Sequence, residues 1–405
     1  MKVLRKIKEE KGSITMTVVA AMLFITSSIL IAYFSLSNQS NDQSKKTRQV
    51  ADSYKVTNSD LIQKYKDVQD NLNDITTMSI TQTKSLGNYM FAKGTNTTVT
   101  DESGNKFVVP AGFKVTDDAD NVTEGMVVQD KDGNEFVWIP VGIKKKSNPN
   151  ETITLGRYLF DSEGSPSIYS GGTYIEEDST DPTSLKNYGN TIAKNIKEFI
   201  SRTNEAGGFY IGRYEARIEG YTGRAYLNTD NEENSFTDYI GGKLVEKPNE
   251  QVFNFVTQNK AAELSRSMYN SNNFESDLIN SYAWDTAILF LQEYDNRTNA
   301  VRSNTNFYKE KYSLQGRLSA NGIKNQGTNN LNVPESSTDK ICNVYDIADN
   351  CYEWSTETNT ANTTYSCIRR GGSYTWSVAG SSNRDAGRGF KVYQYGSFRP
   401  ILYIK

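Results

Sequence analysis

The sequence predicts an α+β head domain over residues 105–405, carried on an N-terminal transmembrane helix (13–34) and a helical stalk and linker (35–104) that follow a cytoplasmic leader (1–12). Three observations predict this organisation. The chain has no charged residue from Gly12 to Asn41, short β-type runs punctuated by glycine begin after the linker, and two later segments have helical spacing.

The N-terminal segment has the features of a membrane anchor. The leader "MKVLRKIKEEKG" is basic, and the apolar stretch from Ile14 to Phe34 is about as long as a helix that crosses a bilayer. The basic flank places the leader in the cytoplasm and the head outside. A cleaved signal peptide is the alternative, because small residues follow at 35–37, but its apolar region should be shorter. We therefore expect a single-pass protein of the cell membrane with an extracellular head.

The stalk contains an amphipathic stripe, in which apolar residues alternate spacings of four and three at Leu61, Tyr65, Val68, Leu72 and Ile75. Such a helix could pair with a second copy or pack on the chain's own head. The leader, apolar helix and amphipathic helix together resemble the layout of type IV pilins, with Gly12 at the cleavage position. The acidic residue usual five positions later is Thr17 here. A pilin-like structural subunit is therefore one alternative.

The head combines β-type runs with two helical segments. Runs rich in Val, Ile, Phe and Tyr, such as "EFVWIPVG" (135–142), predict strands. The spacing of apolar residues predicts helices over 257–269 and 281–294. We expect Trp138, Trp284 and Trp354 to fill the core. No internal period is found, which favours one irregular domain.

The composition excludes several classes of function. The chain has no histidine, which removes Ser-His-Asp and Cys-His catalysis, histidine-ligated metals and the usual near-neutral general base. Its 45 basic and 48 acidic residues include no basic block beyond the leader, so nucleic acid is not an expected partner.

An ordered set of phrases resembles the sulfatase-modifying-factor family, the formylglycine-generating enzymes. The matching stretches span most of the head: "EFVWIPVG" (135–142), "GFYIGRYEA" (208–216), "VTQNKAAELSRSMY" (256–269), "SYAWDTAILFL" (281–291), "NVYDIADNCYEW" (343–354), "IRRGGSY" (368–374), "NRDAGR" (383–388) and "GSFRPIL" (396–402). The resemblance implies an irregular C-type-lectin-like fold.

The same resemblance implies that the head is catalytically silent. Family members that make formylglycine carry two copper-binding cysteines after the "GGSY" turn, whereas this chain has Trp376 and then Ser381, or Gly380 if the segment is one residue short. Neither replaces a thiolate, so copper is not an expected cofactor. An oxidase with a rearranged site that uses the remaining cysteines is an alternative.

The resemblance also implies a calcium site, with side chains from Asp346 and Glu353 and backbone carbonyls from Asp349 and Cys351. The three cysteines lie in the head. Cys351 and Cys367 flank a polar turn in a hairpin-like arrangement and could form a disulfide that leaves Cys342 over. Three reduced, buried cysteines are the alternative.

We therefore predict a surface protein whose head binds a ligand or a partner protein. Aromatic residues and arginine near the C-terminal loops are typical of contact surfaces. The predicted contact residues are Tyr374, Trp376, Ser377, Ser381, Arg384, Tyr393 and Tyr395. Retroelement-diversified binding proteins share the implied fold and vary this window before a "GFRP"-like end, which reads "GSFRP" here. Such diversification is a special case of the binding hypothesis.

Overall fold

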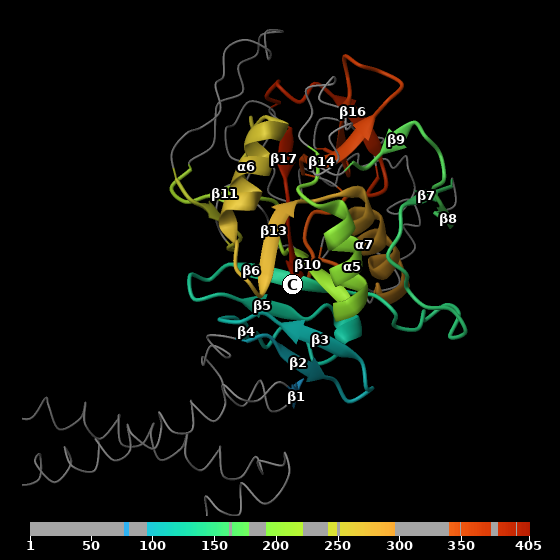
Figure 1. The fold of residues 1–405 in the computed structure, drawn as a ribbon, viewed down its shortest axis with the longest axis vertical. Coiled ribbons are helices and arrows are strands. Elements are labelled where there is room, and N and C mark those ends of the chain that lie inside the picture. Colours follow the sequence, from blue (N-terminus) through green and yellow to red (C-terminus); the bar gives the residue numbers. More distant parts are fainter. Residues whose placement is uncertain are drawn as a thin grey trace, which may run out of the picture.

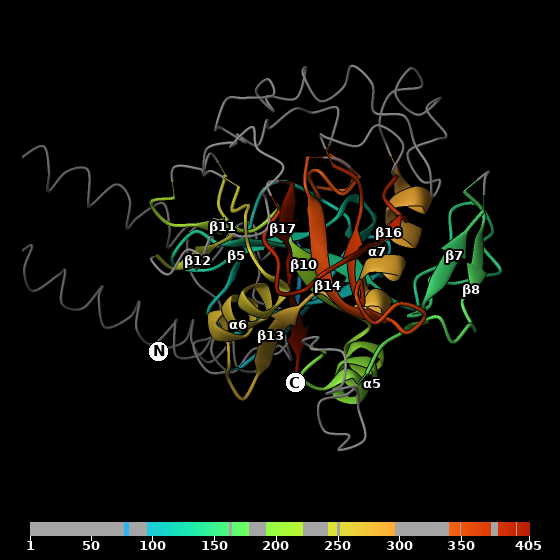
Figure 2. The same cartoon turned by 90° about the horizontal axis from the view of Figure 1, so that it is seen from above.

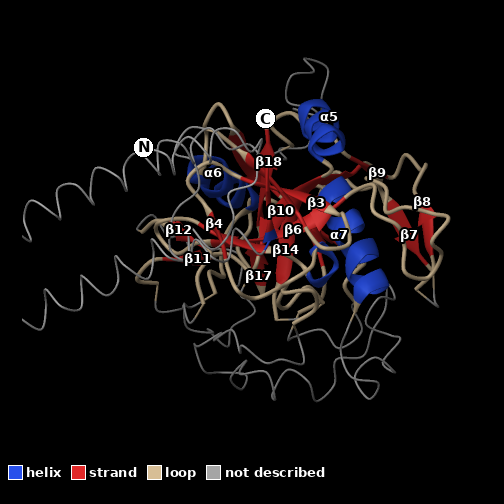
Figure 3. Ribbon diagram, turned by 90° about the horizontal axis from the view of Figure 1, so that it is seen from below, coloured by secondary structure: helices blue, strands red, loops and turns tan. Residues whose placement is uncertain are grey.

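The computed structural model describes residues 77–80, 95–161, 164–177, 192–221, 242–248, 252–295, 340–348, 350–373, 380–393 and 395–405. Within these ranges the chain forms eighteen strands, three α-helices and one short 3-10 turn, η1 (Val122–Glu124). Figure 3 shows how few helices stand among the strands. The described structure is therefore mostly β.

A six-stranded antiparallel sheet forms the centre of the molecule (Figure 1). In spatial order its strands are β13 (Phe274–Leu278), β18 (Pro400–Ile404), β10 (Gly208–Gly212), β6 (Glu135–Pro140), β5 (Val127–Gln129) and β4 (Lys114–Val115). Along β6, Val137 and Ile139 face one apolar cluster, whereas Phe136 and Trp138 face another. Successive strand residues point to opposite faces, so this sheet is buried on both sides.

Different elements cover the two faces of the central sheet. Helices α5 (Ile196–Ala206) and α7 (Ser281–Tyr294) contribute side chains to the cluster around Val137 and Ile139. The opposite cluster includes side chains from a three-stranded sheet of β1 (Thr77–Ser79), β2 (Thr97–Thr100) and β3 (Lys106–Val109). In Figure 1 this small sheet lies below the central one, with α5 and α7 above it.

A second sheet lies next to the central one and is built mainly from the C-terminal part of the chain. Its spatial order is β16 (Arg384–Gly387), β15 (Cys367–Arg370), β14 (Tyr352–Asn359) and β17 (Gly396–Phe398), and β9 (Tyr174–Ile175) also pairs with β14. Helix α6 (Gln258–Met268) packs on this sheet through Ala261 and Ala262, which share a third cluster with Trp354 and Phe398.

Two small hairpin-like pairs complete the described structure. Strand β7 (Tyr158–Phe160) pairs with β8 (Pro166–Ile168), and β11 (Arg217–Ile218) pairs with β12 (Leu244–Val245). Seen from above, the two pairs lie at opposite sides of the molecule (Figure 2).

Each described α-helix begins at a side chain that caps it. Asn195, Thr257 and Asn280 accept hydrogen bonds from the backbone N–H three residues later, at 2.9, 3.2 and 2.9 Å. Helix α5 ends at Gly207, whose φ of 76° is left-handed and suits glycine. Helices α6 and α7 confirm the two predicted segments, while α5 was not predicted. Trp138, Trp284 and Trp354 are fully buried, which confirms their predicted place in the core.

The predicted fold class is wrong for the described residues. They form a mostly β structure rather than an α+β domain on a membrane helix and stalk. Within the range predicted for the helical stalk and linker, Thr77–Ser79 and Thr97–Thr100 are strands, and Ile80 and Val99 belong to the core. Threonine and valine are β-branched, and they pack well in strands.

The predicted membrane location must be corrected as well. Among the described residues, no helix is both long and apolar enough to cross a bilayer. The longest, α7, has 14 residues, which span about 21 Å against a hydrocarbon core of about 30 Å. The segment 13–34 and the stripe from Leu61 to Ile75 lie outside the described residues.

Candidate functional site

The second sheet positions two groups of side chains on its opposite faces. Strand β15 pairs with β16 so that Arg369 lies opposite Asp385, and Arg370 lies opposite Arg384. Since successive residues of a strand point to opposite faces, Arg369 and Arg370 have different surroundings. Arg370 enters a buried network of ion pairs, and Arg369 enters an aromatic cluster.

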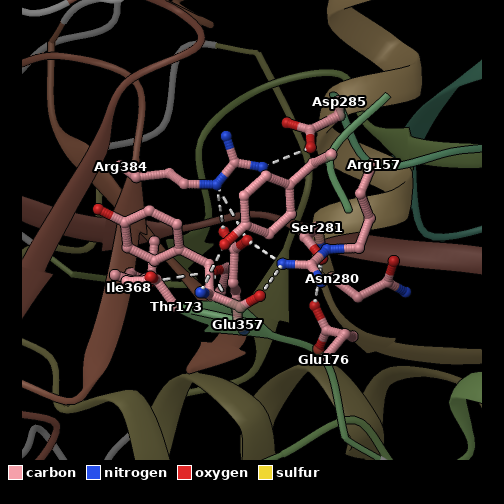
Figure 4. A network of polar contacts seen from close by, with 12 residues as sticks. Arg157, Thr173, Glu176, Asn280, Ser281, Asp285, Glu357, Ile368 and Arg384 are labelled. Carbon is pink, nitrogen blue, oxygen red and sulfur yellow. Dashed lines mark hydrogen bonds and ion pairs between the residues drawn. The ribbon is translucent and has the colours of Figure 1, made fainter. Parts of the chain in front are cut away.

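The ion-pair network joins three arginines to Asp285 and Glu357, and Figure 4 shows Arg157 and Arg384 converging on Glu357. Arg384 Nε donates to the Glu357 oxygens at 2.9 and 3.1 Å, and its Nη2 donates to Asp285 at 2.5 Å. Arg157 and Arg370 donate to Glu357 at 2.7 and 3.0 Å, and Arg370 also pairs with Asp285. The five side chains are at most 11% exposed, so solvent screens the network little.

The network sets the charge of Glu357. Burial alone would raise the pKa of this carboxyl, but the charges of Arg384, Arg370 and Arg157 lower it to about 2. An ionised Glu357 therefore holds Arg157, which precedes β7, against the second sheet. The Arg157 guanidinium also lies 4.9 Å from the ring centroid of Tyr169, the residue after β8. Arg157 therefore contacts both the second sheet and the end of β8.

Glu176, which follows β9, has a different environment close by. Its carboxylate accepts hydrogen bonds from the backbone N–H and the hydroxyl of Ser281 at 2.8 and 2.7 Å, and from the hydroxyl of Thr356. Burial of the carboxylate and the nearby charge of Glu357 raise the pKa of Glu176 to about 7. Glu176 connects β9 to the N-terminus of α7 and to β14 (Figure 4). The ion-pair network and Glu176 thus have a structural role, because they hold β9, α7 and β14 together.

On the other face, Arg369 is surrounded by four aromatic rings. Its guanidinium carbon lies 4.1 Å from the centroid of Tyr393 and 5.1 to 5.3 Å from those of Tyr352, Trp354 and Tyr395. These distances are in the cation–π range. We call Arg369 and the four rings the arginine–aromatic cluster. Its arginine forms an ion pair with Asp385, whose side chain is 34% exposed.

An exposed patch adjoins the arginine–aromatic cluster. Arg388 lies 4.8 Å from the Tyr365 ring centroid and donates from Nη2 to the Tyr365 hydroxyl at 3.2 Å, while its backbone N–H donates to the Tyr393 hydroxyl at 3.2 Å. Phe390 is 73% exposed and Tyr365 is 39% exposed. We call Tyr365, Arg388 and Phe390 the contact patch.

The turn that presents Phe390 is held in place by its neighbours. The backbone carbonyl of Gly389 accepts a hydrogen bond from the Gln258 N–H at 2.9 Å. A Cβ at Gly389 would lie 2.4 Å from Cys367 Sγ, so the close approach of the turn to β15 requires glycine. The exposure of Phe390 is therefore fixed by backbone packing at both α6 and β15.

The four predicted contact residues that the structure describes do not lie on one surface. Tyr393 and Tyr395 lie together, with ring centroids 5.6 Å apart, whereas Arg384 lies in the buried network on the other face. Ser381 is fully buried, and its carbonyl accepts from Trp284 Nε1 at 2.8 Å. The remaining three predicted residues lie outside the described residues, namely Tyr374, Trp376 and Ser377.

Sequence reasoning missed Arg369, Tyr365 and Phe390. A phenylalanine between glycine and lysine in a turn-like phrase, "RGFK", is the signal that could have identified Phe390. No comparable signal marks Arg369, because the adjacent Arg370 has the same local sequence context and opposite surroundings.

Asp346 and Glu353, the predicted calcium ligands, both lie in a buried acidic cluster with Glu215 and Glu246. Burial, together with the charges of Glu353 and Asp346, raises the pKa of Glu215 well above its ordinary range. Burial also raises the pKa of Glu246 to about 8, against the lowering effect of nearby arginines. Some carboxyl groups of this cluster are therefore protonated at neutral pH.

Glu353, one of the predicted calcium ligands, also pairs with an arginine. Arg399 donates to both Glu353 oxygens, with distances of 2.7 Å from Nη2 to Oε1 and 3.0 Å from Nε to Oε2. No group of three Asp, Glu, Cys or His residues suited to hold a metal is found in the part of the chain that the structure describes, and Asp349 lies outside it.

The predicted disulfide between Cys351 and Cys367 does not form, because the hairpin register separates the two residues. Cys367 faces Thr358 on β14, and Cys351 lies before the start of that strand, roughly 20 Å away at about 3.3 Å per residue. All three cysteines are free and buried. Burial raises the pKa of Cys367 to about 12 and that of Cys351 well above its ordinary range, so both remain protonated thiols.

Comparison with known proteins adds little to this geometry. No family model matches the chain, and no curated protein matches it. One solved structure, described as "Crystal Structure of CarF", is 14% identical, with a TM-score of 0.32, and the match covers 67% of this chain and 99% of that one. This likeness is too weak to show a shared fold.

Proposed function

We propose that this protein is a non-catalytic binding protein that contacts a partner protein through the contact patch. The observation that carries the proposal is the 73% exposure of Phe390, two residues after Arg388, which pairs with Tyr365. Aromatic residues and arginine are enriched among the residues that dominate binding energy. Because backbone packing holds the turn, Phe390 loses little conformational freedom when it binds.

The cysteines support a binding role over a rearranged oxidase. Cys342 Sγ lies near backbone carbonyls of Thr123 and Tyr294, Cys351 lies beside Glu215, and Cys367 Sγ lies 3.0 Å from Gln258 Oε1. These are three separate environments. Soft metals bind thiolates, whereas burial keeps Cys351 and Cys367 protonated.

The resemblance to the formylglycine-generating enzymes is part of the same proposal. A head that keeps the "RRGGSY" frame with Trp376 and Ser381 at the reactive positions is an inactive relative whose surface serves recognition. Diversification by a retroelement is tested in the genome. An adenine-mutagenised near-copy of the coding sequence for residues 369–400 beside the gene would support it, and a genome without one would count against it.

Replacing Phe390 by Ser is expected to weaken partner binding by at least about tenfold, since an exposed hot-spot aromatic contributes about 2 kcal/mol or more. The partner is first found by screening protein arrays with the purified chain, and its affinity is then measured by calorimetry. Ile168→Ser is the matched control, because Ile168 is 78% exposed on β8. Equal affinities for the two variants, or a melting temperature changed only in Phe390→Ser, would contradict the proposal.

We also propose calcium binding near Asp346, supported by the excess of carboxyl groups in the acidic cluster. Calcium would be held by oxygen ligands from Asp346 and Glu353, with the Asp349 and Cys351 carbonyls. Because a ligand that binds the folded state stabilises it, EDTA is expected to lower the melting temperature, and calcium to restore it. Asp346→Asn should abolish this response, whereas Asp161→Asn, an exposed control, should preserve it. A melting curve indifferent to EDTA would remove the site.

A further inference from the structure

We infer that Arg369 recognises a carboxylate group of the ligand, an inference that rests on the proposed binding function. The buried guanidinium stands at the centre of the arginine–aromatic cluster, next to the contact patch. It is 5% exposed as a residue, yet it does not use all its hydrogen-bonding capacity.

Two buried nitrogens of Arg369 donate no hydrogen bond within the described residues. Its Nη2 pairs with Asp385, but Nε and Nη1 make no hydrogen bond to any residue that the structure describes. A buried charged donor without a partner is costly, and native proteins rarely leave one unexplained. A ligand acceptor at these nitrogens would remove that cost.

The neighbouring Arg370 has no unused donor, in contrast to Arg369. Arg370, on the same strand, donates from Nε to the Asn383 carbonyl at 3.1 Å, from Nη1 to Glu357 at 3.0 Å and from Nη2 to Asp285. Every nitrogen of that guanidinium is occupied. Arg370 therefore has a structural role, whereas Arg369 retains capacity for a further partner.

The charges around Arg369 favour an anionic group over a neutral one. Arg388 and Lys391 lie on the segment that follows β16, and Asp385 is the only carboxylate of residues 385–391. This segment therefore carries two cations and one anion. A guanidinium with unused N–H donors suits a carboxylate, which accepts charge-assisted hydrogen bonds.

The aromatic rings complete the recognition site. Tyr393 and Tyr352 enclose the guanidinium in a region of low dielectric, where an ion pair is stronger than in water. Two residues around the guanidinium are partly exposed to solvent: Asp385, its ion-pair partner, and Tyr395 of the cluster. The ligand therefore approaches from their side, while Asp385 orients the guanidinium through Nη2.

The test follows the Arg369 Nε–H resonance of the full chain by nitrogen-15 NMR, assigned by its loss in Arg369→Lys. The probes form two matched pairs: a tri-glutamate peptide with tri-glutamine, and galacturonate with galactose. We expect the carboxylate probes to shift the resonance and the neutral ones to leave it in place. A shift with the peptide alone identifies an acidic protein segment, and a shift with galacturonate alone identifies an acidic glycan.

Arg369→Lys keeps the charge and loses the Nε and Nη1 donors, so it should weaken binding of the effective carboxylate probe by at least about tenfold. Arg202→Lys, on the exposed side of α5, is the control and should bind as the wild type does. Equal shifts with neutral probes, no shift with either carboxylate, or an unchanged affinity in Arg369→Lys would overturn the inference.

The same variants separate this inference from the proposed function. If Phe390→Ser weakens the partner protein and Arg369→Lys does not, the contact patch stands and the carboxylate recognition fails. If the carboxylate probes bind through Arg369 while Phe390→Ser leaves partner binding unchanged, the proposed contact patch fails instead.

Discussion

Glu357→Gln should lower the free energy of unfolding by about 3–5 kcal/mol, because it leaves buried arginines without the carboxylate that neutralises them. Glu357 accepts from Arg157, Arg370 and Arg384, and it is fully buried. Asp285 would then be the carboxylate left to Arg370 and Arg384, and Arg157 would lose its ion pair. Urea unfolding, followed by tryptophan fluorescence, measures the change.

Two further variants sharpen this prediction. Glu205→Gln breaks the Arg202–Glu205 pair, whose side chains are 41% and 69% exposed, and should cost less than about 0.5 kcal/mol. Adding Arg384→Met to Glu357→Gln removes one of the excess positive charges and should recover part of the loss. A Glu357→Gln protein as stable as the Glu205 control would show that the network contributes nothing.

Stability should also fall as the pH rises from about 5 to 9, in part through Glu246. Its folded-state pKa is raised to about 8 from an ordinary value of 4.5. The folded state therefore binds the proton more tightly than the unfolded state does. The stabilisation is full below the unfolded pKa and is lost as the pH rises through 8. The total loss from this group is about 5 kcal/mol, at 1.36 kcal/mol per pKa unit.

Glu246→Gln tests the assignment, since glutamine resembles the protonated carboxyl group. The variant should match the wild type near pH 5 and exceed its stability at pH 9, as measured by urea unfolding at each pH. Glu215 and Glu176, whose pKa values are also raised, should leave the variant with a slope in the same direction. The exposed Glu219 provides the control, and Glu219→Gln should follow the wild type. Parallel curves for Glu246→Gln and the wild type would refute the prediction.

Local patterns predicted the elements whose formation depends on nearby residues. Helices α6 and α7 follow from apolar spacing and from caps within three residues of their first turns. The buried positions of Trp138, Trp284 and Trp354 follow from size and hydrophobicity. Helix α5 also has a cap, but its buried stripe is short, with Ile196, Phe199 and Thr203, and it was missed.

The candidate site was predicted only in part, because burial of a polar residue depends on distant partners. Arg384 was expected at a contact surface, yet Asp285 lies 99 residues away in sequence and accepts its Nη2 inside the core. Tyr393 and Tyr395 were both predicted as contact residues, and the arginine near both rings is Arg369. The local sequence "CIRRGG" does not indicate which arginine enters the ion-pair network and which enters the aromatic cluster.

The sequence by itself determined the two helices, the tryptophan core and the absence of histidine chemistry, since each depends on residue type and short-range spacing. Only the tertiary structure decided that the described chain is mostly β, that Cys351 and Cys367 stay apart, and that Arg369 and Arg370 have opposite surroundings. The physical reason is strand register. A shift of one residue along β15 would move each of its side chains to the opposite face of the sheet. The register depends on pairing with β14 and β16, which no local pattern encodes.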